Sequence, residues 1–307
     1  MTRTVPNNVF RAEVVGVRPL SPGLSRITFG GPGLADFLST EVGDEYLRVF
    51  FPHTDDRQLV NLPFPTDNGG WDFAEGSQPA PMRTYTVRAA RPDTGEVDID
   101  FVIHDGGVAA AWALRATPGD VVGLNAPNGL YDPPDDLTRQ LLIADQTGLP
   151  AVCRLLENTP AGIRTKVLLE VPDAEHRLQL PEVEDSEVEV VWSLGGNGHG
   201  PSRLAELLKA ALGPSELAAG LPGGYVWVAG ETKCLRDVRR FLRRDNGLPA
   251  TRYKVIGYWT MDAEQYRDKF QALDEGVRKQ LLSMWDSDRD PEEIEDEYIE
   301  RLEKLGL

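Results

Sequence analysis

The sequence predicts two domains, an N-terminal antiparallel β-barrel over residues 1–135 and a C-terminal α/β domain with a parallel sheet over residues 136–261. An acidic helical extension over residues 262–307 follows them. Three observations predict this fold. The chain of 307 residues is longer than one hydrophobic core usually fills. Its first part contains short runs rich in Val, Ile, Phe and Thr that are separated by turn residues. Its second part alternates such runs with longer helical patterns, which is typical of a parallel sheet with covered faces.

The barrel strands follow one another with turn signals between them. They are expected over residues 10–20, 24–30, 45–51, 83–90, 96–104 and 120–127. In the fifth run the alternation of apolar and polar residues puts Val97, Ile99 and Phe101 on one face, as in a half-buried strand. A short helix is expected over residues 108–116. Residues 53–79, rich in Pro, Asp, Asn and Gly, are expected to form a long loop that is either a lid or an inert insertion.

The second domain is expected to alternate strands with helices. The strands cover residues 139–145, 165–171, 186–194, 224–230 and 250–259, and the helices cover residues 148–159, 202–212 and 231–247. The extension contains two amphipathic helices, the first with apolar residues at three- and four-residue spacing over residues 266–281. Asp290 and Pro291 are expected to cap and open the second, whose apolar stripe covers residues 294–305.

Composition narrows the class of function. The chain has 32 basic and 49 acidic residues and a net charge of −17. The electric field of this negative charge repels phosphate backbones and anionic lipid, so neither nucleic acid nor a membrane is an expected partner. The N-terminus lacks the apolar core of a signal peptide, so we expect a cytoplasmic protein. The two cysteines, Cys153 and Cys234, exclude a cluster held by four thiolates of this chain, and the four dispersed histidines predict no metal site. Any redox cofactor is therefore expected to be organic.

The most informative motif is RTYTVR at residues 83–88. Alternation along a strand points Arg83 and Tyr85 one way and Thr84 and Thr86 the other. A guanidinium beside an aromatic ring can pair with a pyrophosphate while the ring covers a planar heterocycle. A hydroxyl at the strand's edge could meet a flavin nitrogen. The same hexapeptide also fits an ordinary half-exposed strand.

A second motif, DFVIHDGGVAAAWALR, follows at residues 100–115. Its Gly106–Gly107 pair permits close backbone approach, and the helix after it offers free N–H groups to a diphosphate. Further segments are LLIADQTGLPAV at 141–152, YVWVAGE at 225–231 and GYW at 257–259. In this order they resemble the siderophore-interacting protein family of FAD-dependent ferric-siderophore reductases. The resemblance implies a ferredoxin-reductase-like fold in which the barrel holds FAD and the α/β domain holds NADH or NADPH.

The resemblance also implies roles for individual residues. Arg83, Tyr85 and Thr86 match the flavin-binding triplet, and Tyr85 and Thr86 are the expected catalytic residues because they would cover the flavin ring and approach its reactive nitrogen. The other expected cofactor-binding residues are Asp100, Val102, His104, Gly107, Ala109, Ala110, Trp112, Asp145, Thr147, Gly230 and Glu231. The expected substrate contacts are Arg48, Lys233 and Arg236.

Two other features each have two interpretations. The run GGNGHG at residues 195–200 is similar to a dinucleotide fingerprint but has the spacing GxGxG, so we interpret it as a mobile loop. Arg236, Arg239, Arg240 and Arg243 are spaced to share one helix face. That face could hold a 2′-phosphate or an anionic ferric chelate, or it could pair with carboxylates of the extension.

The resemblance therefore predicts an enzyme that uses NADH or NADPH, through FAD, to reduce the Fe(III) of a ferric siderophore and release Fe(II). We expect a monomer, with an oligomer left open. A flavin-dependent reductase with another acceptor, such as free flavin or a quinone, is one alternative. The other is a family member that acts as a binding or interaction protein. Departures from the family's pattern motivate it, at Val108, Ala110, Gln146 and Thr260.

Overall fold

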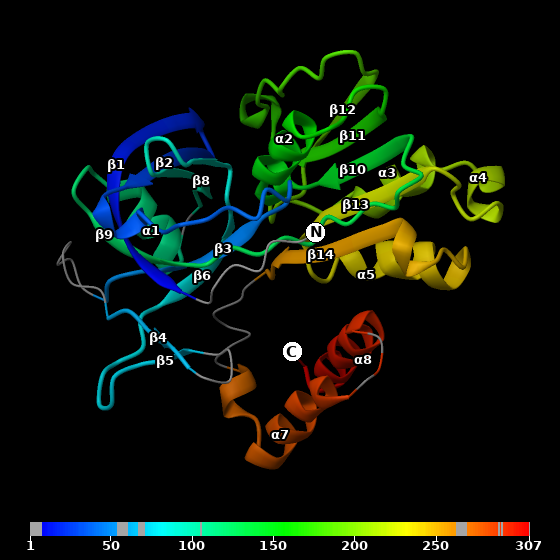
Figure 1. Cartoon of the computed structure of the whole chain (residues 1–307). Coiled ribbons are helices and arrows are strands. Elements are labelled where there is room, and N and C mark those ends of the chain that lie inside the picture. The colour runs from blue at the N-terminus through cyan, green and yellow to red at the C-terminus, as the bar shows by residue number, and fades with distance from the viewer. Residues whose placement is uncertain are drawn as a thin grey trace.

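The computed structural model describes residues 8–53, 61–66, 71–104, 106–261, 269–287, 289 and 291–306. Two large sheets form the body of the protein, and the helices of the C-terminal extension lie to one side of it (Figure 1). The first sheet comes from the N-terminal part of the chain and the second from the middle part, in agreement with the predicted fold class. None of the helices in the described ranges is long and apolar enough to cross a membrane.

The N-terminal sheet has seven strands, and its strand pairs are antiparallel. They are β1 (Val9–Ser21), β2 (Leu24–Gly30), β3 (Tyr46–Phe50), β6 (Met82–Thr86), β7 (Ala89–Arg91), β8 (Glu96–Val102) and β9 (Val121–Asn125). Their spatial order is β6-β3-β9-β1-β2-β8-β7. The short helix η1 (Pro32–Leu34) and helix α1 (Val108–Arg115) lie in the connections.

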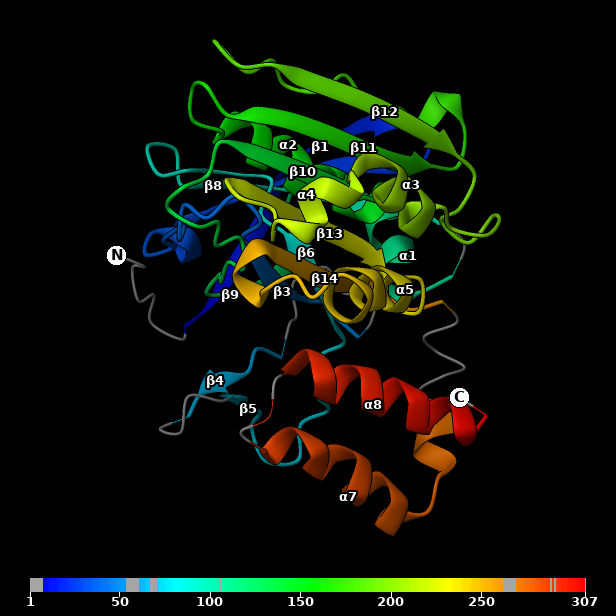
Figure 2. The same ribbon diagram turned by 90° about the vertical axis from the view of Figure 1, so that its right-hand side faces the viewer.

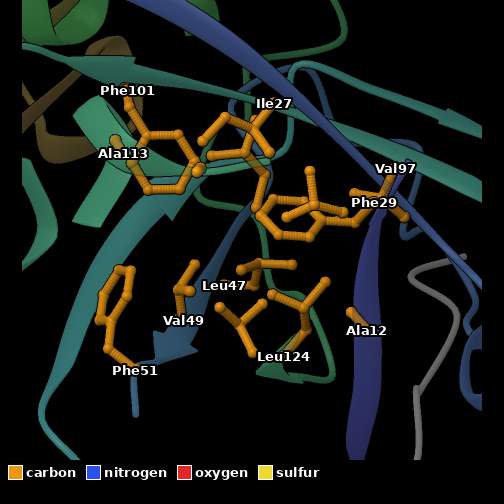
Figure 3. Close-up of a cluster of buried hydrophobic side chains, with 14 of the residues drawn as sticks. Ala12, Ile27, Phe29, Leu47, Val49, Phe51, Val97, Phe101, Ala113 and Leu124 are labelled. Atoms are coloured by element: carbon orange, nitrogen blue, oxygen red, sulfur yellow. The ribbon is translucent and has the colours of Figure 1, made fainter. Parts of the chain in front are cut away.

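Alternate residues along these strands form one apolar core. Val97, Ile99 and Phe101 of β8 lie in it, as the alternation predicts. Asp98 and Asp100, between them, bond to β2 side chains outside it. Figure 3 shows the ring of Phe101 gathered with core side chains of the neighbouring strands, including Ile27, Phe29, Leu47, Val49 and Leu124. Burying a side chain of this size stabilises the fold by about 1.5–3 kcal/mol. A shift of β8 by one residue would turn Val97, Ile99 and Phe101 out of the core, so the alternation along β8 fixes its register.

The structure corrects the strand expected over residues 83–90, which is divided into β6 and β7. The N–H of Val87 donates to the carbonyl of Glu45, beside β3, at 2.8 Å, whereas the N–H of Arg88 donates to the carbonyl of Asp98 in β8, also at 2.8 Å. The chain therefore changes its strand partner between these two residues. Because β6 is the last strand on its side, the sheet is open beyond it within the described ranges.

In the range 53–79, where a long loop is expected, the structure has two very short strands, β4 (Phe64–Pro65) and β5 (Trp71–Asp72), which pair antiparallel. Residues 54–60 and 67–70 of this range lie outside the described residues. Trp71 packs edge-on against Phe50 of β3, with 5.7 Å between ring centroids. This aromatic contact attaches β5 to the rim of the N-terminal sheet.

The second sheet has five parallel strands. They are β10 (Arg139–Ala144), β11 (Arg164–Val171), β12 (Val188–Leu194), β13 (Gly224–Glu231) and β14 (Tyr253–Trp259), in the order β12-β11-β10-β13-β14. The helices between them are η2 (Gln146–Gly148), α2 (Leu149–Glu157), η3 (Ala174–His176), α3 (Leu204–Ala211), α4 (Pro214–Ala218), α5 (Leu235–Arg239), η4 (Arg240–Asp245) and η5 (Ala250–Arg252). Each expected strand and helix of this domain is present, with shifted ends.

Helices cover both faces of the parallel sheet. On one face α2 contributes Leu149 and Val152 to the core. On the other face α3 and α5 contribute Leu208 and Val238. The chain moves outward from β10 to β12 and then crosses back to β13, so the strand order reverses between β10 and β13. In open sheets of this kind, ligands bind outside the carboxyl ends of the strands at such a reversal.

The extension forms α7 (Glu275–Ser283), η6 (Met284–Asp286) and α8 (Pro291–Lys304). The predicted first helix is divided: residues 269–272 are helical, and α7 begins after Asp274, which caps it by accepting a hydrogen bond from the N–H of Gly276 at 2.8 Å. Residues 266–268 of the predicted helix lie outside the described residues. The predicted cap Asp290 lies outside the described residues.

Helix α8 lies beside α5 and η4, as Figures 1 and 2 both show. Ile294, Ile299 and Leu302 of α8 are buried. Glu293 accepts a hydrogen bond from Arg243 of η4 at 2.9 Å. This ion pair confirms that carboxylates of the extension meet the arginines of this helix. Leu305, at the end of the predicted stripe, is exposed.

Candidate active site

Strand β6 carries the RTYT residues at the open edge of the N-terminal sheet. Its register with β3 pairs Tyr85 with Leu47 and Arg83 with Val49, both core residues. Arg83 and Tyr85 therefore share the face that points toward the core, as the alternation predicts. The ring of Tyr85 lies 4.4 Å from that of Phe101, centroid to centroid. The two rings are tilted by 41°, so the phenol packs at an angle against the end of β8.

Arg83 is half-buried on the same edge. Its Nη1 donates to the carbonyl of its neighbour Met82 at 2.8 Å. A guanidinium has five N–H donors in a planar fork, so further donors remain for a bound anion. The side chain suits a doubly charged group such as a pyrophosphate.

Thr86 lies on the opposite face of β6, where the two domains meet. Its side chain is buried, and its hydroxyl finds no partner of hydrogen-bonding geometry among the described residues. The phenol of Tyr258, from β14, is close enough for the two hydroxyls to interact. Burial raises the pKa of Tyr258 well above its ordinary value. The Thr86 hydroxyl is thus a buried polar group with unused bonding capacity, a common sign of a ligand site.

The two glycines before α1 have the backbone conformation that the motif requires. Gly106 has a φ of 83° and Gly107 a φ of 78°, in the left-handed region that favours glycine. No atom lies within 4 Å of the place where a Cβ of Gly106 would be. The ring of exposed His104 lies 3.4 Å from the corresponding point at Gly107. The first N–H groups of α1 have no partner within the helix, so this turn can receive an anion.

Several predicted cofactor contacts lie in the core or in ion pairs. Trp112 is buried against Phe51 and Phe101, with ring centroids 5.4 and 5.8 Å away. Ala109 and Ala110 are buried in the same helix, and Val102 is half-buried where β8 ends.

Asp100 accepts two hydrogen bonds from Arg26, at 2.6 and 2.8 Å, and its side chain is 2% exposed. Its carboxylate is thereby held on β2. The Asp100 carboxylate is thus paired with Arg26, and the Trp112 indole is packed in the core.

Asp145 ends β10 at the point where the strand order of the parallel sheet reverses. Its carboxylate accepts hydrogen bonds from the N–H and hydroxyl of Thr147, at 2.8 and 2.6 Å, and from the indole of Trp259 at 2.6 Å. Burial raises the pKa of Asp145, and these hydrogen bonds oppose that rise. The residue ties the ends of β10 and β14 together.

Gly230 and Glu231 end β13 beside Asp145. A Cβ at Gly230 would lie 3.0 Å from the Asp145 carboxylate and from Leu204, so a larger residue would not fit without a shift. Buried Glu231 accepts hydrogen bonds from the N–H groups of Cys234 and Met261, at 2.9 and 3.2 Å. The structure thus brings these predicted residues together with Thr147 at one edge of the sheet.

The glycine-rich loop at residues 195–200 also reaches this edge, which the sequence did not indicate. Asn197, with a φ of 51°, accepts a hydrogen bond from the N–H of Gln146 at 2.8 Å and donates to the carbonyl of Glu170 at 3.1 Å. The side chain of Gln146 donates to the carbonyl of Gly23, in the N-terminal domain, at 3.1 Å. The departure from the family's pattern at Gln146 therefore forms a bond between the domains.

The three predicted substrate contacts lie on different elements. The guanidinium of Arg48, on β3, lies over the ring of Trp71, 4.7 Å from its centroid. Lys233 is exposed in the turn that precedes α5. Arg236 is half-buried on α5 and interacts with Glu300 of the extension. The structure does not gather them around one point.

The four arginines do not form the single open face that their spacing predicts. Arg239 is 1% exposed, and Arg240 pairs with Asp237. Arg243 pairs with Glu293. Arg239 is buried although it lies in the regular helix α5, and the segment from Arg240 on is a π-helical turn.

A cavity of about 220 Å³ lies at the opposite, amino-terminal edge of the parallel sheet. It is lined by ion-paired side chains, including Arg139 with Glu216 and Lys166 with Glu189. It is separate from the edge that carries Asp145 and Glu231.

The fold and this edge define a ferredoxin-reductase-like protein, with an antiparallel sheet followed by a five-stranded parallel sheet. The structure is similar to that of the ferredoxin reductase in carbazole 1,9a-dioxygenase, with a TM-score of 0.58 and 15% identity, over 84% of this chain and 71% of that one. At this identity the likeness shows the fold alone.

Residues 13–131 match the siderophore-interacting FAD-binding domain, and residues 137–262 match the siderophore-interacting protein domain. The chain therefore belongs to the siderophore-interacting protein family. It is 30% identical to the NADPH-dependent ferric-chelate reductase of Escherichia coli over 249 residues, 80% of this chain and 91% of that protein. Its structure is similar to that of a siderophore utilization protein from T. fusca, with a TM-score of 0.71 and 28% identity, over 85% of this chain and 96% of the other.

FAD is the cofactor of the domain that residues 13–131 match. The residues at the open edge of β6 fit this group. Arg83 offers guanidinium donors to a diphosphate, and the Gly106–Gly107 turn lets the diphosphate approach the backbone. Thr86 offers a buried hydroxyl with unused bonding capacity.

Proposed function

We propose that this protein is an FAD-dependent reductase that uses NADH or NADPH to reduce the Fe(III) of a ferric siderophore and so releases Fe(II). The observation that carries the proposal is the contact between the edge strand β6 of the N-terminal sheet and the carboxyl edge of the parallel sheet. The buried hydroxyl of Thr86 lies against Tyr258, which precedes the Trp259 bonded to Asp145 at the reversal point of the parallel sheet. The name of the Escherichia coli relative supports the reaction.

The residues of the chain would have separate roles. Arg83 would pair with the diphosphate, Tyr85 would cover one face of the flavin ring, and Thr86 would donate a hydrogen bond to it. Gly230 and Glu231 would shape the coenzyme edge, because no side chain projects from the first and the second holds the loop that follows β14. FAD, when bound, takes a hydride from a reduced nicotinamide and passes on electrons singly.

The substrate contacts remain proposals. We propose that Arg48, Lys233 and Arg236 attract the ferric chelate. In this structure Arg48 lies over Trp71 and Arg236 interacts with Glu300. Siderophores present hard oxygen donors, which hold Fe(III) better than Fe(II), so reduction weakens the complex. We also propose that the protein acts as a monomer in the cytoplasm. We propose domain boundaries after residues 135 and 261.

An anaerobic assay tests the proposed function. Purified protein is loaded with FAD and mixed with NADH or with NADPH, and the visible flavin absorbance is followed. A ferric siderophore, free flavin or a quinone is then added in separate experiments. We expect bleaching by one of the coenzymes and reoxidation by the ferric siderophore. Reoxidation by free flavin or quinone alone would indicate a reductase with another acceptor. A protein that does not bind added FAD would indicate a binding or interaction protein instead of a reductase.

A further inference from the structure

A buried ion pair joins the two domains behind the candidate site. Arg154 lies on α2, and its Nη1 donates to Oε1 of Glu45, just before β3, at 2.9 Å. The Glu45 side chain is fully buried and that of Arg154 is 9% exposed. Buried charges are costly unless they are paired and hydrogen-bonded, so both side chains of this pair need hydrogen-bonding partners for their other polar atoms.

Both members of the pair have further partners. Glu45 accepts hydrogen bonds from the hydroxyl of Ser39 at 3.0 Å and from the N–H and hydroxyl of Thr40. The Nη2 of Arg154 donates to the hydroxyl of Ser39 at 3.0 Å. The guanidinium and the carboxylate thus form one buried polar network between the domains.

The network reaches the strand that carries the flavin motif. The same Nη1 of Arg154 donates to the carbonyl of Val87 at 2.7 Å. The N–H of Val87 in turn donates to the carbonyl of Glu45 at 2.8 Å. Val87 directly follows Thr86, so a side chain of the coenzyme domain holds the end of β6 in place.

The neighbouring residue Asp44 strengthens this joint. Its carboxylate accepts hydrogen bonds from the N–H groups of Leu130 and Tyr131, at 2.7 and 2.8 Å, and from the indole of Trp227 in β13 at 2.9 Å. Two consecutive acidic residues of the N-terminal domain are thus bound by residues 130 and 131 of the same domain and by β13 and α2 of the second domain. The planar guanidinium of Arg154 donates to three oxygen atoms, those of Glu45, Val87 and Ser39. This geometry suits an arginine and not a lysine.

We propose that Arg154 is a positioning residue of the reductase, which fixes Thr86 and the flavin strand at a constant distance from the coenzyme edge. Its action is indirect, through Glu45 and the Val87 carbonyl. The catalytic part of the inference rests on the proposed function, whereas the joining of the domains does not.

The test compares three variants with the wild-type holoprotein. Arg154→Met combined with Glu45→Gln removes both charges, so that no unpaired charge is left buried. Arg154→Lys keeps the charge but not the fork. Glu157→Gln is the matched control, because Glu157 forms the other ion pair between α2 and this segment, with Arg88 at 2.6 Å, and its side chain is 41% exposed.

Calorimetry tests the connection between the two domains and does not require an active enzyme. Wild type and Glu157→Gln are expected to unfold in one transition, whereas the double variant unfolds in two, one for each domain. The dissociation constant for FAD, from fluorescence quenching, is expected to rise in the double variant, because the end of β6 is no longer fixed.

Stopped-flow measurement of the rate of flavin reduction tests the catalytic consequence. In the double variant we expect the rate of flavin reduction at saturating coenzyme to fall by about 10- to 100-fold, because a small misplacement of reacting groups has such effects. The KM for coenzyme should stay within about twofold, since the coenzyme edge is untouched. Arg154→Lys should recover part of the rate.

A double variant that unfolds in one transition and reduces FAD at the wild-type rate would overturn the proposal, as would an equal loss in Glu157→Gln. If the wild type shows no reduction with either coenzyme, the proposed function fails. Calorimetry and FAD binding then still decide whether Arg154 joins the domains.

Discussion

At the scale of single residues, the open edge of β6 divides its chemistry between two faces. Arg83 and Tyr85 lie on the side of the core, where a diphosphate and a planar ring can be held. Thr86 lies on the side of the second domain, where its buried hydroxyl meets Tyr258. A ligand that lies across this edge can therefore contact both domains at once.

Arg83→Ala is expected to weaken FAD binding. The lost charge-assisted contact to a diphosphate is worth on the order of 1.5–3 kcal/mol, which corresponds to roughly 10- to 100-fold in the dissociation constant. Fluorescence quenching of FAD during titration of the apoprotein measures it. Arg18→Ala is the control, since Arg18 is an exposed arginine of β1. Equal affinity in the two variants would contradict the role of Arg83.

Thr86→Val should separate stability from function. The change removes a buried hydroxyl without a hydrogen-bonding partner, so the apoprotein is expected to keep its stability or gain up to about 1 kcal/mol. Flavin reduction should slow by about tenfold, because a hydrogen bond to the cofactor is lost. Urea unfolding and stopped-flow absorbance are the measurements. A variant that is destabilised yet reduced at the normal rate would show that Thr86 is only structural.

The buried thiol of Cys153 predicts a pH dependence of stability. Burial raises the pKa of Cys153 from 9.0 to about 11. The unfolded state therefore loses its proton first, and the stabilisation by this group is lost as pH rises from 9 to 11. The advantage of wild type over Cys153→Ala in urea unfolding should shrink across this range. A constant difference between pH 7 and pH 11 would contradict the assignment.

At the scale of elements, the alternation and the turn residues predicted most of the structure, and partners distant in sequence decided the rest. The apolar face of β8 follows from its own residues. The role of Asp100 does not, because its partner Arg26 lies 74 residues away, on β2. Trp112 is likewise a core residue because Phe51 and Phe101 surround it.

The helix after β13 shows a second limit of sequence patterns. Regular spacing predicted one face for the arginines from Arg236 to Arg243, but the fold buries Arg239, and a π-helical turn begins at Arg240. The interdomain roles of Arg154 and Glu45 had no signal in a single sequence either. Each looks like an ordinary charged residue until the fold places them in contact.

The extension predicts a further outcome at this scale. Glu293 pairs with Arg243, and the pKa of Glu300 is lowered by Lys304 first and also by the nearby Arg236. Glu293→Gln combined with Glu300→Gln should loosen α8 from the body and speed amide hydrogen exchange in this helix. Added salt should do the same in the wild type, because exposed pairs are screened.

Glu297→Gln is the matched control for this experiment. Glu297 pairs with Arg289 and Arg301, which both belong to the extension. Exchange in α8 that responds equally to both sets of changes would show that the contact with the body is not the cause.

At the scale of the whole molecule, the two domains are joined by hydrogen bonds and by a buried ion pair. Gln146 bonds to Gly23, and Arg154 to Glu45 and Val87. These contacts hold the edge of β6 toward the reversal point of the parallel sheet. The net charge of −17 is concentrated in part on the extension, outside the residues that match the family. The acidity is therefore partly a property of the extension and only partly one of the reductase body.

The most direct test of the central claim is a single anaerobic experiment on the FAD-loaded protein. NADH or NADPH is added until the flavin absorbance is bleached, a ferric siderophore follows, and Fe(II) is trapped by a coloured chelator. We expect bleaching, then recovery of the flavin absorbance together with the colour of the Fe(II) complex. Bleaching followed by no recovery and no Fe(II) with any ferric siderophore would contradict it.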